Sequence, residues 1–146
     1  MNSGHSITKR YSNLKAAHRQ WRHPGHCSFV HGENWTFDIT FKADSLDKMN
    51  FVVDFGKLHA VRDFLDKQFD HTLLIDMDDP QKAFFERNAS AGVWDVRFVP
   101  SASAEGLAEY VLRHVNTIIA KETEGRVSVA KVVCFEDEKN SAEFVA

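Results

Sequence analysis

Cysteine is scarce in this chain, and neither a long apolar run nor an excess of positive charge is present. The two cysteines could form at most one disulfide, and the polar, basic start MNSGHSITKR has no apolar signal core. We therefore expect a soluble cytoplasmic protein with free thiols. No segment approaches the ~20 apolar residues of a membrane span. The net charge of −3 does not favour nucleic-acid binding but allows an anionic small-molecule substrate.

The chain has the size and composition of one globular domain. Its 146 residues are 43% hydrophobic and 27% charged, and they contain no internal repeat or low-complexity segment. Twelve phenylalanines indicate a core or an interface with much aromatic packing. We expect a single domain over residues 1–146.

Apolar residues at every second position predict four strands. The clearest pattern is 35–41, where one buried face would hold Trp35, Phe37, Ile39 and Phe41. Less regular strands are expected over 5–17, 93–99 and 127–136. In the last strand, Cys134 would point away from Val133 and Phe135, and the polar tail after it would be loose.

Helical spacing predicts three helices between these strands. One spans roughly 56–69 behind a possible cap at Asp54, and a second is short and begins near Pro80. The third, from Glu105 to about Ile119, is clearly amphipathic. The acidic run 76–79 reads as a solvated turn. Together these elements predict an α+β fold, a four-stranded antiparallel sheet with helices on one face.

The segment 17–34 concentrates residues that can bind metals or transfer protons, including four of the eight histidines. On an extended backbone His31 and Glu33 share one face, and His18 could join them from a neighbouring strand. Two imidazoles and a carboxylate form an acceptable zinc site with an open position. Cys27 lies close enough to a bound cation for its reactive thiolate to be favoured. A chance cluster of histidines is the competing interpretation.

A second candidate pair is Asp70-His71, directly after the predicted helix 56–69. The structural interpretation is a surface pair or a helix cap. The functional interpretation is a histidine that transfers protons and is supported by a carboxylate. Glu105 has a simpler explanation, because a carboxylate in the first turn of a helix is favoured by the helix dipole.

Six short motifs, in order along nearly the whole chain, resemble the 6-pyruvoyl-tetrahydropterin synthase and 6-carboxy-tetrahydropterin synthase family. The resemblance is carried by Ala16-Ala17-His18, Cys27-x-x-x-His31-Gly32-x-Asn34, Val53-Asp54-Phe55-Gly56, Phe69-Asp70-His71, Ser103-Ala104-Glu105-Gly106-Leu107-Ala108 and Phe135-Glu136. It implies a tunnelling fold, in which sheets of three subunits join into a barrel and two trimers stack into a homohexamer. Active sites would lie between subunits.

The resemblance also implies roles for individual residues. Zinc would be bound by His18, His31 and the residue at position 33, and would act as a Lewis acid on the side chain of a pterin triphosphate. Proton transfer would fall to Cys27, Asp70 and His71. Substrate binding would involve Glu136, whose carboxylate can accept two hydrogen bonds from the pterin, and the Ser103 hydroxyl.

The chain departs from the family pattern at a few positions. Glu33 stands where the family has histidine, which keeps a possible His₂Glu site but adds negative charge and favours a harder metal such as manganese or iron. His23 or His26 could compensate. Further departures, at Ile75, Ala104 and Gly106, concern the details of pterin contact.

The function that the resemblance implies is 6-carboxy-5,6,7,8-tetrahydropterin synthase, acting on 7,8-dihydroneopterin triphosphate in queuosine-type biosynthesis. The alternatives are the 6-pyruvoyl-tetrahydropterin synthase reaction, cleavage of the dihydroneopterin side chain, and a non-catalytic pterin- or purine-binding protein. Family members that cleave the side chain tend to replace the cysteine by glutamate, and Cys27 is present here. Candidates for binding the triphosphate, by position, are Arg10, Lys15, Arg19 and Arg22.

Overall fold

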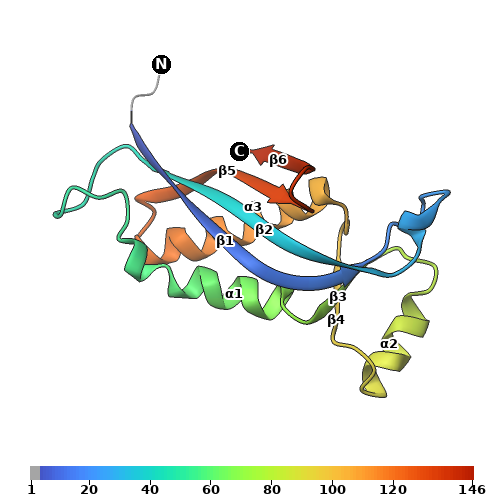
Figure 1. Cartoon of the computed structure of the whole chain (residues 1–146). Coiled ribbons are helices and arrows are strands. Elements are labelled where there is room, and N and C mark those ends of the chain that lie inside the picture. Colours follow the sequence, from blue (N-terminus) through green and yellow to red (C-terminus); the bar gives the residue numbers. More distant parts are fainter. Residues whose placement is uncertain (1–3) are drawn as a thin grey trace.

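A computed structural model describes residues 4–146 as a curved sheet of six strands with three helices (Figure 1). The strands are β1 (His5–His18), β2 (His31–Ala43), β3 (Thr72–Asp76), β4 (Val96–Val99), β5 (Val127–Phe135) and β6 (Ser141–Val145). Their order across the sheet is β4-β3-β1-β2-β5-β6. Strands β3 and β4 run parallel to each other and to β1, whereas the other neighbours are antiparallel.

The α+β class is confirmed, but the predicted four-stranded antiparallel sheet is wrong. Strand β3 was missed because all five of its residues are buried, so its sequence has no polar–apolar alternation. Strand β6 was missed because it is a short edge strand with no buried residue. The tail predicted to be loose therefore pairs with β5 and forms one edge of the sheet.

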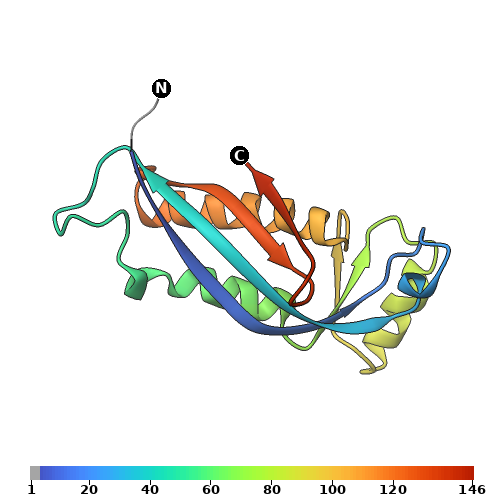
Figure 2. The same cartoon turned by 45° about the horizontal axis from the view of Figure 1, so that its top comes forward.

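The long antiparallel pair of β1 and β2 runs through the centre of the sheet (Figure 2). A bulge between Tyr11 and Leu14 interrupts its register, and Asn13 there has a positive φ of 60°. The four apolar residues predicted to share the buried face of β2 are all 0% exposed: Trp35, Phe37, Ile39 and Phe41.

Two helices, α1 (His59–Phe69) and α3 (Ala104–Glu122), lie side by side on one face of the sheet in both views (Figures 1 and 2). Their buried residues join those of the sheet in the main core. Helix α1 begins three residues later than predicted, because 55–57 form a 3-10 turn that the Asp54 side chain caps. Helix α2 (Lys82–Ser90) lies instead at the end of the molecule that carries β3 and β4.

A bulge in β5 changes which of its side chains face the helices. Thr40 pairs with Lys131 but the next residue, Phe41, pairs with Val129, so Ala130 is left over. Beyond this point Val132 and Cys134 are buried, whereas Val133 and Phe135 are only half-buried. The prediction that Cys134 lies on the opposite face from Val133 and Phe135 is confirmed, but Cys134 takes the core side.

The acidic turn, residues 76–79, is less solvated than predicted. Asp76 and Asp79 are buried, at 6% and 4% exposure, because both carboxylates hold hydrogen bonds from other parts of the chain. Asp78 remains exposed. None of the helices within residues 4–146 is long and apolar enough to span a membrane.

Candidate metal centre

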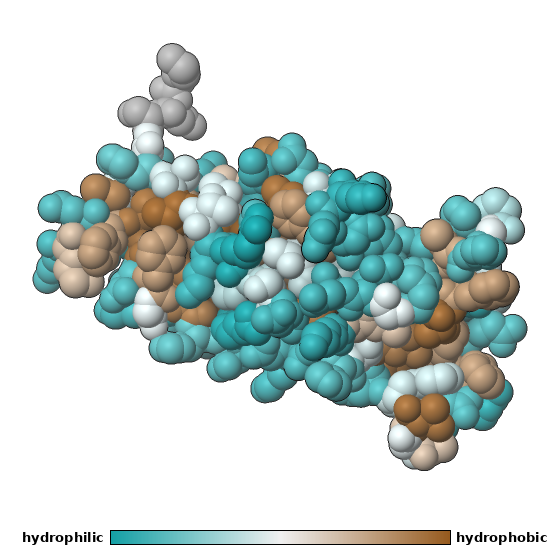
Figure 3. Space-filling model, in the orientation of Figure 1, coloured by the Kyte–Doolittle hydropathy of each residue, from teal (hydrophilic) through white to brown (hydrophobic). Residues whose placement is uncertain are grey.

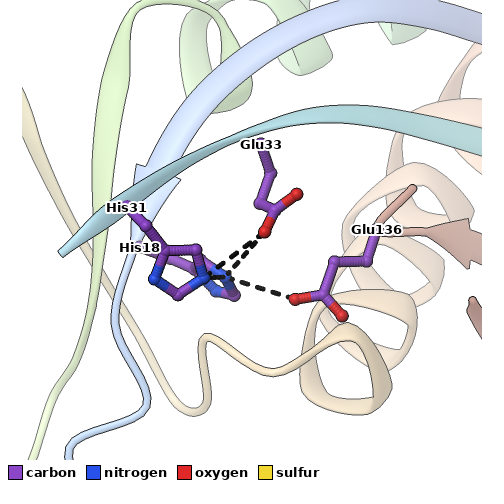
Figure 4. Close-up of side chains that lie close together, drawn as sticks. All are labelled: His18, His31, Glu33 and Glu136. Carbon is purple, nitrogen blue, oxygen red and sulfur yellow. Dashed lines mark hydrogen bonds and ion pairs between the residues drawn. The ribbon is translucent and has the colours of Figure 1, made fainter. Parts of the chain in front are cut away.

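Four side chains meet at the end of the β1–β2 hairpin with their donor atoms close together (Figure 4). The Nε2 atoms of His18 and His31 are 3.0 Å apart. A Glu33 oxygen lies 3.3 Å from His31 Nε2, and a Glu136 oxygen lies 3.4 Å from His18 Nε2. All four donor atoms fall within 4.8 Å of one another.

The other nitrogen of each imidazole is already committed to the backbone. His18 Nδ1 lies 2.7 Å from the carbonyl oxygen of Ala102, and His31 Nδ1 lies 2.7 Å from that of Phe29. A carbonyl can only accept, so each Nδ1 carries the hydrogen and each Nε2 presents a lone pair in the neutral ring. Metal-binding histidines are oriented by hydrogen bonds of this kind.

Burial lowers the pKa of His18, the most deeply buried member of this group. His18 is 0% exposed, packs edge-on against Trp35 and has its pKa lowered to about 4, because desolvation disfavours its charged form. A neutral imidazole is the form that binds metals. The peptide that receives the His18 hydrogen bond is fixed in turn, because the N–H of Ala102 donates to the buried Asp76 carboxylate at 2.6 Å.

The two carboxylates of the group both have raised pKa values, because both are partly desolvated. Burial raises the pKa of Glu33, and the neighbouring Glu136 adds to that effect. Burial likewise raises the pKa of Glu136, with a further contribution from Asp137. Two imidazole lone pairs and two carboxylates without a cation form a strongly electron-rich pocket, which suits a divalent metal ion.

Strand register brings these residues together. In the β1–β2 ladder His18 pairs with His31, and Ala16 pairs with Glu33, so all three ligands predicted from sequence lie on the helix-covered face. Glu136 lies two residues after the buried Cys134 and therefore on the same side of the sheet. Both residues take this side because of the bulge at Ala130. The family resemblance implies only a pterin-binding role for Glu136, and its position among the potential metal ligands was not predicted.

Cys27 lies in the loop between the two histidine-bearing strands, on the 3-10 turn η1 (His26–Ser28). It lines a cavity of about 690 Å³ together with Glu136 and Glu105.

His23 lines the same cavity, and His26 stacks near Phe29, but neither belongs to the four-residue donor group of the described chain. Cys134, by contrast, is fully buried, and burial raises the pKa of its thiol.

Asp70 and His71 lie between α1 and β3, and His71 has a positive φ of 59°. The backbone there lets the adjacent side chains meet, with His71 Nδ1 3.2 Å from an Asp70 oxygen. Desolvation raises the pKa of Asp70, but hydrogen bonds from the Lys15 N–H and from His71 outweigh it and leave the pKa below its usual value. His71 is exposed and lines a cavity of about 1090 Å³ together with Glu33 and Glu136.

Within one chain, therefore, Cys27 and His71 line different cavities, and Glu136 lines both.

Ser103 caps helix α3, since its hydroxyl accepts a hydrogen bond from the N–H of Gly106 at 3.0 Å. Glu105, which sequence reasoning assigned to the helix dipole, also faces the Cys27 cavity.

Three of the four basic residues considered for triphosphate binding are already paired. Arg10 bonds Asp38, Arg19 bonds Asp79, and Arg22 bonds Asp78. Lys15 lines the larger cavity beside His71.

Comparisons of sequence agree with the motifs. The model of the family described as 6-pyruvoyl tetrahydropterin synthase matches residues 6–146. A 6-carboxy-5,6,7,8-tetrahydropterin synthase of Rickettsia typhi is 34% identical over 73 residues, which are 49% of this chain and 53% of that protein. The enzyme of the same name from Aquifex aeolicus is 28% identical over 123 residues, covering 81% of this chain and 75% of that protein. The chain thus aligns with about half the length of the Rickettsia relatives it matches.

Solved structures share the fold over the whole chain. An uncharacterised protein from Wolinella succinogenes superposes with a TM-score of 0.82 at 20% identity, covering 98% of both chains. The 6-pyruvoyl tetrahydropterin synthase of Plasmodium vivax superposes with a TM-score of 0.71 at 18% identity, covering 97% of both chains. With the family model matching nearly every residue, the chain belongs to the 6-pyruvoyl tetrahydropterin synthase family.

Proposed function

We propose that this chain is a cytoplasmic 6-carboxy-5,6,7,8-tetrahydropterin synthase that acts on 7,8-dihydroneopterin triphosphate. The products are 6-carboxy-tetrahydropterin, acetaldehyde and triphosphate, in the route to queuosine-type 7-deazaguanines. The observation that carries the proposal is the pair of Nε2 lone pairs facing two carboxylates, beside a cavity lined by a cysteine. The names of the relatives in Rickettsia and Aquifex support the carboxylated product.

The donor set fits a divalent cation. His18, His31 and Glu33 would hold one Zn²⁺ per subunit, and Glu136 is close enough to be a fourth ligand. When bound, the metal supplies Lewis acidity that makes the C–H bonds next to a coordinated hydroxyl or carbonyl easier to deprotonate. Glu33 in place of a histidine gives the site more affinity for harder cations such as Mn²⁺ or Fe²⁺ than a three-histidine site has.

The protein's own groups then move protons and hold the pterin. Cys27 is proposed as the acid or base acting on the substrate side chain, and the Asp70–His71 pair as the relay for the second proton. Glu136 has two carboxylate oxygens, so one can face His18 while the other accepts hydrogen bonds from the pterin. Ser103 is proposed to lie near the pterin ring.

A homohexamer, a dimer of trimers, accounts for the separation of the proposed groups. In one chain Cys27 and His71 line different cavities, so a second subunit would be needed to supply the relay histidine to the thiol's cavity. Joining sheets at the outer strands β4 and β6 into a barrel would also cover their unpaired edges. Active sites would then lie between subunits.

The test is to incubate purified protein of known metal content with 7,8-dihydroneopterin triphosphate and to identify the products by mass spectrometry. We expect a 6-carboxy product, acetaldehyde and triphosphate, and loss of all three in Cys27→Ala. A 6-pyruvoyl product would assign the protein to the alternative synthase. Side-chain cleavage without loss of triphosphate, or intact bound substrate, would overturn the proposal in favour of an aldolase-type enzyme or a pterin-binding protein.

A further inference from the structure

The loop that carries Cys27, residues 19–30, is attached to the rest of the chain through the acidic turn 76–79. In the described part of the chain, every hydrogen bond that a side chain of this loop donates to a residue outside it ends on Asp78 or Asp79. The loop thus depends on side-chain contacts to the acidic turn rather than on the sheet ladder that holds β1 and β2.

Arg19 makes the central contact. Its Nε and one terminal nitrogen donate to the two oxygens of Asp79, both at 2.7 Å, in the parallel two-bond geometry that is the strongest form of this pair. The Asp79 side chain is 0% exposed, and that of Arg19 is 19% exposed. A buried carboxylate with a two-bond arginine partner holds its geometry far better than a surface ion pair does.

The same two residues connect the loop to the β3–α2–β4 unit at several points. Asp79 also accepts a hydrogen bond from the N–H of Gln81 at 2.8 Å, immediately before helix α2. The Arg19 guanidinium lies 5.6 Å from the ring centre of Phe85, which is buried in the small core under α2. Figure 3 shows apolar side chains on the surface at this end of the molecule.

On the loop side, Arg19 is linked to the segment that bears the thiol. Its other terminal nitrogen lies 3.5 Å from the carbonyl oxygen of Ser28, the residue after Cys27. The carbonyl of Cys27 itself accepts a hydrogen bond from the N–H of Gln20 at 2.7 Å. Arg19 directly follows the metal-ligand candidate His18 in the chain, so the residue that contacts Asp79 and Ser28 is also adjacent to the metal centre.

We propose that Arg19 and Asp79 are positioning residues that hold the Cys27 loop over the metal centre, so that the thiol stays within reach of the substrate. The inference rests on the proposed function. It also means that Arg19 is not available to bind the triphosphate. Arg22, with Asp78, adds an exposed and weaker contact of the same kind.

The test compares the wild type with Arg19→Gln, Arg19→Lys, Asp79→Asn and the double variant Arg19→Gln/Asp79→Asn. The double variant removes both charges and so avoids leaving an unpaired buried charge if a single variant fails to fold. Arg113→Gln, which breaks an exposed pair with Glu109 on α3, is the matched control. Each metal-loaded protein is measured for hydrogen exchange in residues 19–30, for alkylation of Cys27 by iodoacetamide, and for kcat and KM.

In folded Arg19→Gln or in the double variant, we expect faster exchange in the loop, an altered alkylation rate at Cys27, and kcat lower by on the order of tenfold to a hundredfold with a smaller change in KM. Arg19→Lys should recover part of each effect, and Arg113→Gln should match the wild type. If the folded variants show the same hydrogen-exchange and alkylation rates as the wild type, Arg19 and Asp79 do not position the loop and the proposal is wrong. If the wild type forms no product but the variants show altered loop exchange and alkylation, the positioning role is supported and the synthase assignment is rejected, because these two measurements need no turnover.

Discussion

The Nε2 atoms of His18 and His31 face each other at 3.0 Å, although the Nδ1 atom of each ring is hydrogen-bonded to a carbonyl oxygen. In the neutral tautomers neither Nε2 carries a hydrogen, so the two lone pairs repel unless a proton or a cation lies between them. A metal ion bound between the four side chains would relieve this repulsion and that of the two nearby carboxylates.

The first prediction concerns the pH dependence of stability in metal-free protein. Burial lowers the pKa of His18 to about 4 from 6.5, so the unfolded chain takes up a proton on this residue before the folded chain does. The stability due to neutral His18 is complete above about pH 6.5 and declines as the pH falls toward 4, by up to about 3 kcal/mol. Urea unfolding in the presence of a chelator measures it, with His18→Gln as the reference. Equal pH slopes in the two proteins between pH 6.5 and 5 would contradict the assignment.

The second prediction concerns the choice of metal. Glu33→His recreates the three-histidine set of the family, so it should raise the affinity for Zn²⁺ relative to Mn²⁺ by on the order of tenfold or more. Glu33→Ala should weaken the binding of both ions. Competition titrations of the metal-free proteins measure the ratio without turnover. The control is Glu143→Ala, because Glu143 lies on the edge strand β6 and forms an exposed pair with Lys131 of β5. An unchanged Zn²⁺/Mn²⁺ ratio in Glu33→His would show that position 33 is not a ligand.

The third prediction concerns Gly106, one of the departures from the family pattern. A Cβ at this position would overlap Ser101, whose carbonyl oxygen would lie only 2.7 Å away. Alanine normally stabilises a helix relative to glycine, but here we expect Gly106→Ala to lower the free energy of unfolding by about 1–3 kcal/mol. Thermal and urea unfolding measure the effect. Ser101→Gly in the same chain should recover part of it, and no recovery would mean that the overlap is with the backbone alone.

The fourth prediction concerns Tyr11, whose hydroxyl is buried and has no hydrogen-bond partner among residues 4–146. Burial also raises its pKa to about 12. Removing an unsatisfied buried hydroxyl relieves a desolvation cost of about 1–3 kcal/mol, so Tyr11→Phe should be more stable than the wild type. Tyr110→Phe, at a half-buried position on α3, is the matched control and should change stability little. A loss of stability in Tyr11→Phe would mean that the hydroxyl is satisfied in solution.

Sequence alone was sufficient where local patterns are strong. The alternation around Trp35–Phe41 identified β2 and its buried face, and the spacing of His31 and Glu33 correctly placed both on one face of an extended segment. Helical spacing found α1 and α3 with errors of a few residues at their ends. The order of the six short motifs identified the family, and the family model matches residues 6–146.

Tertiary structure decided what depends on partners distant in sequence. Buried β3 shows no alternation, so only its parallel pairing with β1 and β4 defines it as a strand. The acidic turn is buried because Arg19 neutralises Asp79, a pairing across 60 positions that no local pattern reveals. Glu136 joins the metal-ligand candidates because a single extra residue, Ala130, reverses the facing of the end of β5. Side chains alternate with period two along a strand, so one bulge moves every later residue to the other face, and its position is fixed by the pairing of the strands.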